Sequence, residues 1–308
     1  MGLFSNKKKL CPICESPTPR LFPTVVDGMP ICKECKKKIN LPDGVLDAMS
    51  LEDFRQYMAY HQENAALRET FETTVSWNSV IDLDPPKRLF RLGGGDQGLV
   101  LEASCLRAFR ILEDDKVLFE NGPDGLLCYE NDILARAEAL APAISQFHIL
   151  MEQYRQVEQM KEMRKNDPNG DSAPSLPYVS RPYFDQQLIH QGFKLELTLE
   201  HPYWGGVHSW IGDAPQFNDS SPSVTNFMNK YNKDAEALHT LAGGLMTLIC
   251  PGAPEIAVQS GVPADGAAAR VVPVTDPVGE IKRYKALLDS GVITDEEFSA
   301  KKRQLLGI

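Results

Sequence analysis

Two CxxC pairs near the start of the chain constrain its fold more than any other feature. The stretch CPICESPTPRLFPTVVDGMPICKEC contains Cys11 and Cys14 in the first pair and Cys32 and Cys35 in the second. Four thiolates repel one another, so they converge on one point only where a cation such as zinc holds them. Seventeen residues separate Cys14 from Cys32, a spacing typical of four-cysteine zinc sites. The pattern predicts a closed, structural zinc site with these four cysteines as its ligands.

The residues between the two pairs predict a small hairpin. RLFPTVVDGMPIC reads as two short strands joined at Asp27-Gly28, a dipeptide suited to tight turns. Such a module has almost no core, so metal binding would supply much of its folding free energy. A redox pair of the thioredoxin type is an alternative use of CxxC, but that motif opens a helix and does not occur in facing duplicates. The predicted zinc-ribbon domain covers residues 9–48.

Charge is distributed unevenly along the 308 residues, whose formal net charge is −10. Residues 1–40 carry eight Lys or Arg and three Asp or Glu, so the rest of the chain is strongly acidic. An acidic protein with one short basic N-terminal segment lacks the extended basic surface that binding along a nucleic acid requires. The start MGLFSNKKKL has neither the pattern of a signal peptide nor that of a myristoylation site, and no apolar run is long enough to span a bilayer.

The cysteines outside the two pairs indicate the compartment. Cys105, Cys128 and Cys250 are scattered and odd in number, which is typical of buried thiols in a reducing cytoplasm. We therefore expect a cytoplasmic protein without a transmembrane segment.

Hydrophobic periodicity divides the remaining chain. Residues 49–71 predict a connecting helix, with Ser50 as N-cap and Asp53 completing a capping box. Residues 72–250 predict a central α+β domain, with short strands at 77–120 and 193–212 and a helical and loop insertion at about 131–180. His201 and His208 lie with three aromatic residues in one predicted hairpin, which is slight evidence for a ligand pocket. LGGGDQG, residues 92–98, lacks the Lys-Ser/Thr ending of a phosphate-binding loop and predicts a hairpin loop.

A long amphipathic helix closes the predicted central domain. Ser221 is its expected cap and Pro222 its first residue, and the helix runs to Cys250. Its apolar stripe predicts a core-facing side that covers the sheet. The stripe consists of Val224, Phe227, Met228, Tyr231, Leu238, Leu241, Leu245 and Leu248.

The C-terminal part of the chain predicts a linker and a small helical module. Residues 251–275 are rich in Pro, Gly and Ala and read as a flexible linker. Residues 276–308 read as a helical hairpin broken at Gly291, with a capping box at Thr294 and Glu297. A module of this size cannot bury enough apolar surface alone, so we expect it to dock on the same chain or on another copy.

Three resemblances to known families accompany these patterns. IKRYKALLDSGVITDEEFSAKKRQLLG resembles the SHOCT domain, a short C-terminal helical hairpin of many bacterial proteins, which implies an oligomerisation or docking element. The N-terminal CPIC and DGMPICKEC segments resemble a bacterial zinc-ribbon domain of unknown function, with the four cysteines on its ligand positions. The central region resembles a pleckstrin-homology-like barrel, a bent sheet closed by a C-terminal helix.

These features together predict a non-catalytic, zinc-binding scaffold or adaptor that acts through protein–protein interaction and forms a homo-oligomer through its C-terminal hairpin. No local motif assembles a nucleophile with its base, and no open metal position is predicted, so we do not expect an enzyme. Two alternatives stay open. The basic zinc ribbon could bind nucleic acid through its lysines, or a pleckstrin-homology-like domain could bind a membrane surface.

Overall fold

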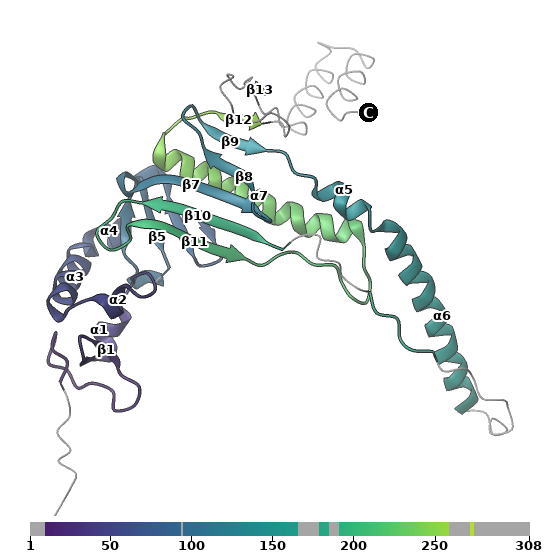
Figure 1. Ribbon diagram of the computed structural model, residues 1–308, viewed down its shortest axis with the longest axis horizontal. Coiled ribbons are helices and arrows are strands. Elements are labelled where there is room, and N and C mark those ends of the chain that lie inside the picture. Colours follow the sequence, from purple (N-terminus) through teal and green to yellow (C-terminus); the bar gives the residue numbers. More distant parts are fainter. Residues whose placement is uncertain (1–9, 94, 166–178, 185–190, 259–271, 274–308) are drawn as a thin grey trace, which may run out of the picture.

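The computed structural model describes residues 10–93, 95–165, 179–184, 191–258 and 272–273. These residues form a mixed α+β structure, which confirms the expected class. Figure 1 shows an elongated arrangement, with a small N-terminal module at one end, two sheets with a long helix in the middle, and a projecting helical arm at the other end. No helix in the described part of the chain is both long enough and apolar enough to cross a membrane.

The N-terminal module contains a hairpin followed by two short helices. Strands β1 (Thr24–Val26) and β2 (Met29–Ile31) pair in antiparallel fashion, and helices α1 (Lys33–Lys37) and α2 (Val45–Ala48) follow. Asp27 and Gly28 both have positive φ, 50° and 72°, as the two central residues of a type I′ hairpin turn require. The sequence prediction of a hairpin turn at this dipeptide is confirmed.

Two consecutive helices connect this module to the sheets. Helix α3 (Leu51–Glu63) begins at Ser50, whose side chain accepts a hydrogen bond from the Asp53 amide while the Asp53 carboxylate accepts one from the Ser50 amide. The predicted capping box is therefore present. The single helix expected over residues 49–71 is interrupted at Asn64, after which α4 (Ala65–Thr70) continues.

The first sheet of the central region is a four-stranded antiparallel meander in the order β3-β4-β5-β6. Short 3-10 turns, η1 (Pro85–Lys87) and η2 (Gly95–Gln97), lie between its later strands, and η3 (Ala103–Cys105) follows it. Its apolar side chains are buried on both faces in places, as at the consecutive pairs Leu89–Phe90 and Val100–Leu101. Its strands are β3 (Val75–Trp77), β4 (Ile81–Asp84), β5 (Leu89–Leu92) and β6 (Val100–Glu102).

The second sheet has seven strands in the order β11-β10-β7-β8-β9-β12-β13. All neighbours are antiparallel except β9 and β12, which run parallel. Strand β10 alternates buried and half-buried residues along its whole length, as its sequence predicted. The strands are β7 (Leu106–Glu113), β8 (Lys116–Asn121), β9 (Leu126–Tyr129), β10 (Phe193–Leu199), β11 (Gly206–Gly212), β12 (Glu255–Val258) and β13 (Val272–Pro273).

Helix α7 (Val224–Ile249) packs against strands of both sheets. Its buried side chains include Leu238, Leu241 and Leu245 from the predicted stripe. The expected barrel is not confirmed, because the described strands of the central region form two separate sheets and no closed barrel. The expected cap is also displaced. Ser223 caps α7, since Ser221 is held in a preceding turn by the backbone and side chain of Asn218.

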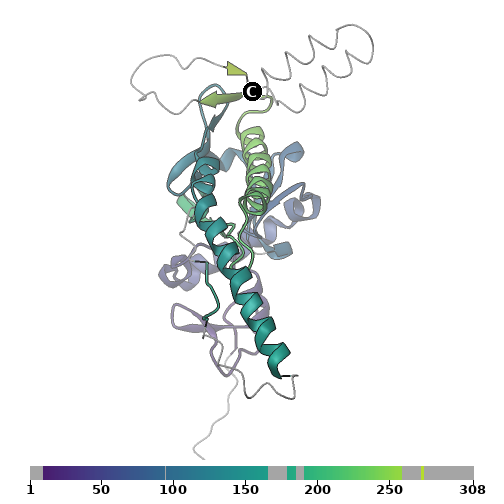
Figure 2. The same ribbon diagram turned by 90° about the vertical axis from the view of Figure 1, so that its right-hand side faces the viewer.

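The insertion predicted near residues 131–180 contains a helical arm. Helix α5 (Ile133–Glu138) is followed by α6 (Ala141–Lys165), which extends away from the sheets (Figures 1 and 2). At its base a series of aromatic contacts joins α6 to α7, from Phe147 through Phe184 and Phe217 to Phe227. The rings of Phe217 and Phe227 stack with their centroids 4.6 Å apart.

The segment predicted as a linker begins with ordered structure. Residues 255–258 form β12, and Ile256 is buried. This pairing needs Gly125, because a Cβ atom there would lie 2.2 Å from the Pro254 carbonyl oxygen. Most of the remaining linker, residues 259–271 and 274–275, and the predicted hairpin at 276–308 lie outside the described residues.

Asn40 joins the N-terminal module to both sheets. Its side-chain amide donates to the Leu92 carbonyl (2.9 Å), and its side-chain oxygen accepts from the Leu99 amide (3.1 Å). Its backbone carbonyl accepts from the Trp204 indole (3.0 Å), and its backbone amide donates to the Tyr57 hydroxyl (2.7 Å). One buried residue therefore completes the hydrogen bonding of three distant segments.

Replacing Asn40 with alanine should lower the free energy of unfolding by about 2–4 kcal/mol, because the buried Leu92 carbonyl and Leu99 amide both lose their partner. Chemical denaturation of the full chain measures the change. The matched control is Asn229→Ala on the exposed face of α7, which should change the stability by less than about 0.5 kcal/mol. Equal effects of the two substitutions would contradict the role given to Asn40.

Candidate metal centre

The first CxxC pair lies in a tight turn that is closed by the antiparallel bridge between Leu10 and Pro17. The Cys11 amide donates to the Ser16 carbonyl, and the Glu15 amide donates to the Cys11 carbonyl, both at 2.9 Å. Glu15 has a φ of 60°, which folds the chain back sharply. This turn brings the Cys11 and Cys14 side chains to the same side of the module.

The second pair lies where β2 ends and α1 begins. Cys32 is the N-cap of α1, and its sulfur accepts a hydrogen bond from the Cys35 amide at 3.4 Å. An amide that donates to a cysteine sulfur favours its thiolate form, because the donor stabilises negative charge. The helical turn then places the Cys35 side chain beside that of Cys32.

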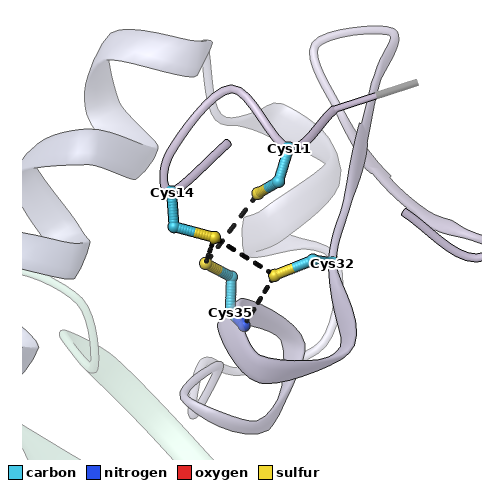
Figure 3. Close-up of side chains that lie close together, drawn as sticks. All are labelled: Cys11, Cys14, Cys32 and Cys35. Atoms are coloured by element: carbon cyan, nitrogen blue, oxygen red, sulfur yellow. Dashed lines mark hydrogen bonds between the residues drawn. The ribbon is translucent and has the colours of Figure 1, made fainter. Parts of the chain in front are cut away.

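The four sulfur atoms converge on one point, as Figure 3 shows. All lie within 4.8 Å of one another. The separation is 3.4 Å between Cys14 and Cys32, 3.6 Å between Cys14 and Cys35, and 3.9 Å between Cys11 and Cys35. A tetrahedral site with metal–sulfur bonds of 2.3 Å has sulfur–sulfur edges of about 3.8 Å. The observed cluster therefore has nearly the size of such a shell.

Burial is unequal within the cluster. Cys11, Cys32 and Cys35 are at most 4% exposed, whereas Cys14 lies at the surface. Burial raises the pKa of Cys32 and of Cys35. The pKa of Cys14 falls to about 6, mainly because the Ser16 side chain and backbone hydrogen-bond to its sulfur. Ser16 was not among the predicted site residues, although its position two residues after the first pair was a usable signal.

The pKa shifts of these cysteines bear on how the cluster could bind a metal ion. The buried thiols of Cys32 and Cys35 resist ionisation on their own, so a bound cation has to displace their protons. The four predicted cysteines are all brought together and could bind one metal ion. Since the protein would supply all four ligands, no position is left open for water or a substrate. The arrangement suits a structural centre rather than a catalytic one.

The other residues singled out in the sequence have structural roles. His201 is buried, its Nε2 lies 2.9 Å from the Tyr60 hydroxyl, and its Nδ1 accepts from the amides of Tyr203 and Trp204 at 3.2 Å. His208 is bonded to the Trp204 carbonyl instead of facing His201. The two histidines therefore do not form a joint pocket. The glycine-rich segment joins the antiparallel strands β5 and β6, as expected of a hairpin loop.

Comparison with known proteins identifies one domain. The family model of the short C-terminal domain, SHOCT, matches residues 280–306. This match confirms the SHOCT domain expected from the sequence, and its residues lie outside the described part of the structure. The comparisons with curated proteins and with solved structures found no match. The resemblance of the N-terminal segment to a zinc ribbon stays a prediction.

Substituting Cys35 with serine should abolish tight metal binding, because it removes one of four ligands from a closed shell. The metal content per chain, measured by elemental analysis after gel filtration with a mild chelator, should fall from one ion to none. The exposed Cys250 provides the matched control, and Cys250→Ser should retain the ion. A tightly held ion in the Cys35→Ser protein would exclude the four-cysteine centre.

Proposed function

We propose that the chain is a non-catalytic, zinc-binding scaffold that acts through protein–protein interaction and self-assembly. Three features support the proposal: a cluster of four cysteines that could bind a metal ion, an exposed apolar loop between the two cysteine pairs, and a SHOCT domain at residues 280–306. The SHOCT match carries the most weight, because the size of that domain requires a docking surface elsewhere.

Zinc is the metal that best fits the four-cysteine cluster. A tetrahedral set of four thiolates selects zinc or iron among the common metals. Zinc has no redox chemistry and contributes folding free energy directly in small modules with little core. An iron ion in the same shell would be coloured and redox-active, so an absorption spectrum and elemental analysis separate the two metals.

The loop between the two cysteine pairs is the best candidate for a partner-binding surface. Leu21 is 79% exposed and Phe22 is 96% exposed, and Phe22 has a positive φ of 49°. Val25 and Met29 on the adjoining hairpin are each 44% exposed, and they lie on opposite faces of it because Met29 pairs with Val26. The adjacent, exposed side chains of Leu21 and Phe22 therefore favour a protein contact site in this loop.

Light scattering of the full chain and of a chain ending at Pro273 tests self-assembly. The shorter chain lacks the SHOCT domain but keeps every described residue. We expect the full chain to form a defined oligomer and the shorter chain to be a monomer, each with tightly held zinc. Two monomers would show that the SHOCT domain does not mediate self-assembly, and zinc-free protein of both lengths would contradict the zinc assignment.

The double substitution Leu21→Ser and Phe22→Ser should remove partner binding without lowering the melting temperature, since both side chains are exposed. Co-purification from cell extract, followed by identification of the bound proteins, measures the loss. Ile211→Ser is the matched control, because Ile211 is 78% exposed on β11, far along the chain. The proposal for this loop fails if the double substitution and the control recover the same proteins, nucleic acids or lipids.

A further inference from the structure

A second group of metal-ligating side chains lies where three elements of the central region meet. Cys128 belongs to β9, His239 to α7 and Glu255 to β12. Because β12 and β9 run parallel, with Ala257 opposite Cys128, residues Glu255, Ala257 and Cys128 share one face of the pair. Helix α7 contributes His239 to the same place.

The distances within this group are those of ligands around one ion. One candidate ligand atom from each of the three residues lies within 4.8 Å of the other two. His239 Nε2 and Glu255 Oε2 are 3.1 Å apart. Metal–ligand bonds of 2.0–2.3 Å in a tetrahedral site give edges of about 3.3–3.7 Å, so small side-chain movements suffice to admit an ion.

The chemical types of the ligands select the class of metal. A thiolate with an imidazole and a carboxylate suits zinc and similar transition metals, whereas calcium and magnesium prefer oxygen ligands alone. Three protein ligands leave a fourth position open for water. The group should therefore hold metal more weakly than the four-cysteine cluster.

Accessibility agrees with a site that exchanges metal with the solvent. Cys128 is half-buried, and the side chains of His239 and Glu255 are 43% and 39% exposed. The Phe119 ring lies against His239, with centroids 5.4 Å apart, and limits the directions in which the imidazole can turn. The ligands are thus partly oriented before an ion binds, yet the ion can reach them from solvent.

We propose that Cys128, His239 and Glu255 form a second, exchangeable site for Zn²⁺ or a similar transition metal, which fastens β12 to β9 and α7. Without the ion, the exposed contact between His239 and Glu255 contributes little to stability. With the ion bound, one side chain from each of the three elements coordinates the same metal. The inference does not rest on the proposed scaffold function or on the zinc assigned to the four-cysteine cluster.

The position of β12 connects the proposed site to the C-terminal part of the chain. β12 ends at Val258 and precedes the residues that lead to the SHOCT domain at 280–306. Its ladder with β9 is short, with Gly125 permitting the close approach of Pro254. An ion bound by Glu255 would therefore control how firmly the start of the C-terminal part is attached to the body.

Titration of Co²⁺ into the full chain, with zinc retained in its tight site, tests the proposal. We expect one additional ion per chain, with visible absorption bands that indicate a thiolate ligand. Cys128→Ser, His239→Gln and Glu255→Gln should each weaken this binding by at least about 10-fold, since removal of even an outer partner of a metal ligand costs about that much. Cys250→Ser and His208→Gln are the matched controls and should bind as the parent does.

Hydrogen exchange supplies a second measurement. Zn²⁺ should slow amide exchange at residues 255–258 in the parent chain and leave it unchanged in His239→Gln. A melting temperature equal to that of the parent chain shows that each variant is folded. The proposal is overturned if the parent binds no additional ion, or if the ligand variants bind Co²⁺ as tightly as the controls. A second ion that leaves exchange at 255–258 unchanged would overturn the fastening of β12.

Discussion

Convergence of four thiols on one point is the constraint on which the N-terminal part of the structure depends. Three of these cysteines are buried, and burial raises the pKa of two of them, so a metal ion bound by the cluster would have to displace their protons. The hairpin of β1 and β2 adds only short strands and few buried side chains. Metal binding and folding of this module are therefore expected to be one event.

A metal ion bound by the four cysteines would also affect residues beyond the module. The chain leaves the second cysteine pair through α1 and reaches Lys38, whose carbonyl accepts a hydrogen bond from Tyr57 of α3. Asn40 follows and bonds to both sheets through Leu92, Leu99 and Trp204. An ion that orders Cys32 and Cys35 thus fixes the position from which these bonds are made. Loss of the ion should loosen the contact between the module and the central region.

Local patterns were predictable from the sequence, whereas long-range pairing was not. The cysteine spacing, the Asp27-Gly28 turn and the Ser50 capping box involve residues close together in the chain, and all were predicted correctly. The pairing of β12 with β9 joins segments about 130 residues apart, and nothing in the Pro- and Gly-rich sequence around it indicates a strand. The roles of Asn40 and of the Cys128 group depend on such distant contacts, so composition and periodicity could not reveal them.

X-ray absorption spectroscopy of the purified full chain, after a mild chelator has removed exchangeable ions, identifies the bound metal and its ligands. A structural zinc ion should give a zinc edge and a first shell of four sulfur atoms at about 2.3 Å. A shell containing nitrogen or oxygen ligands, or protein that holds no metal after this treatment, would contradict the claim that Cys11, Cys14, Cys32 and Cys35 bind a structural zinc ion.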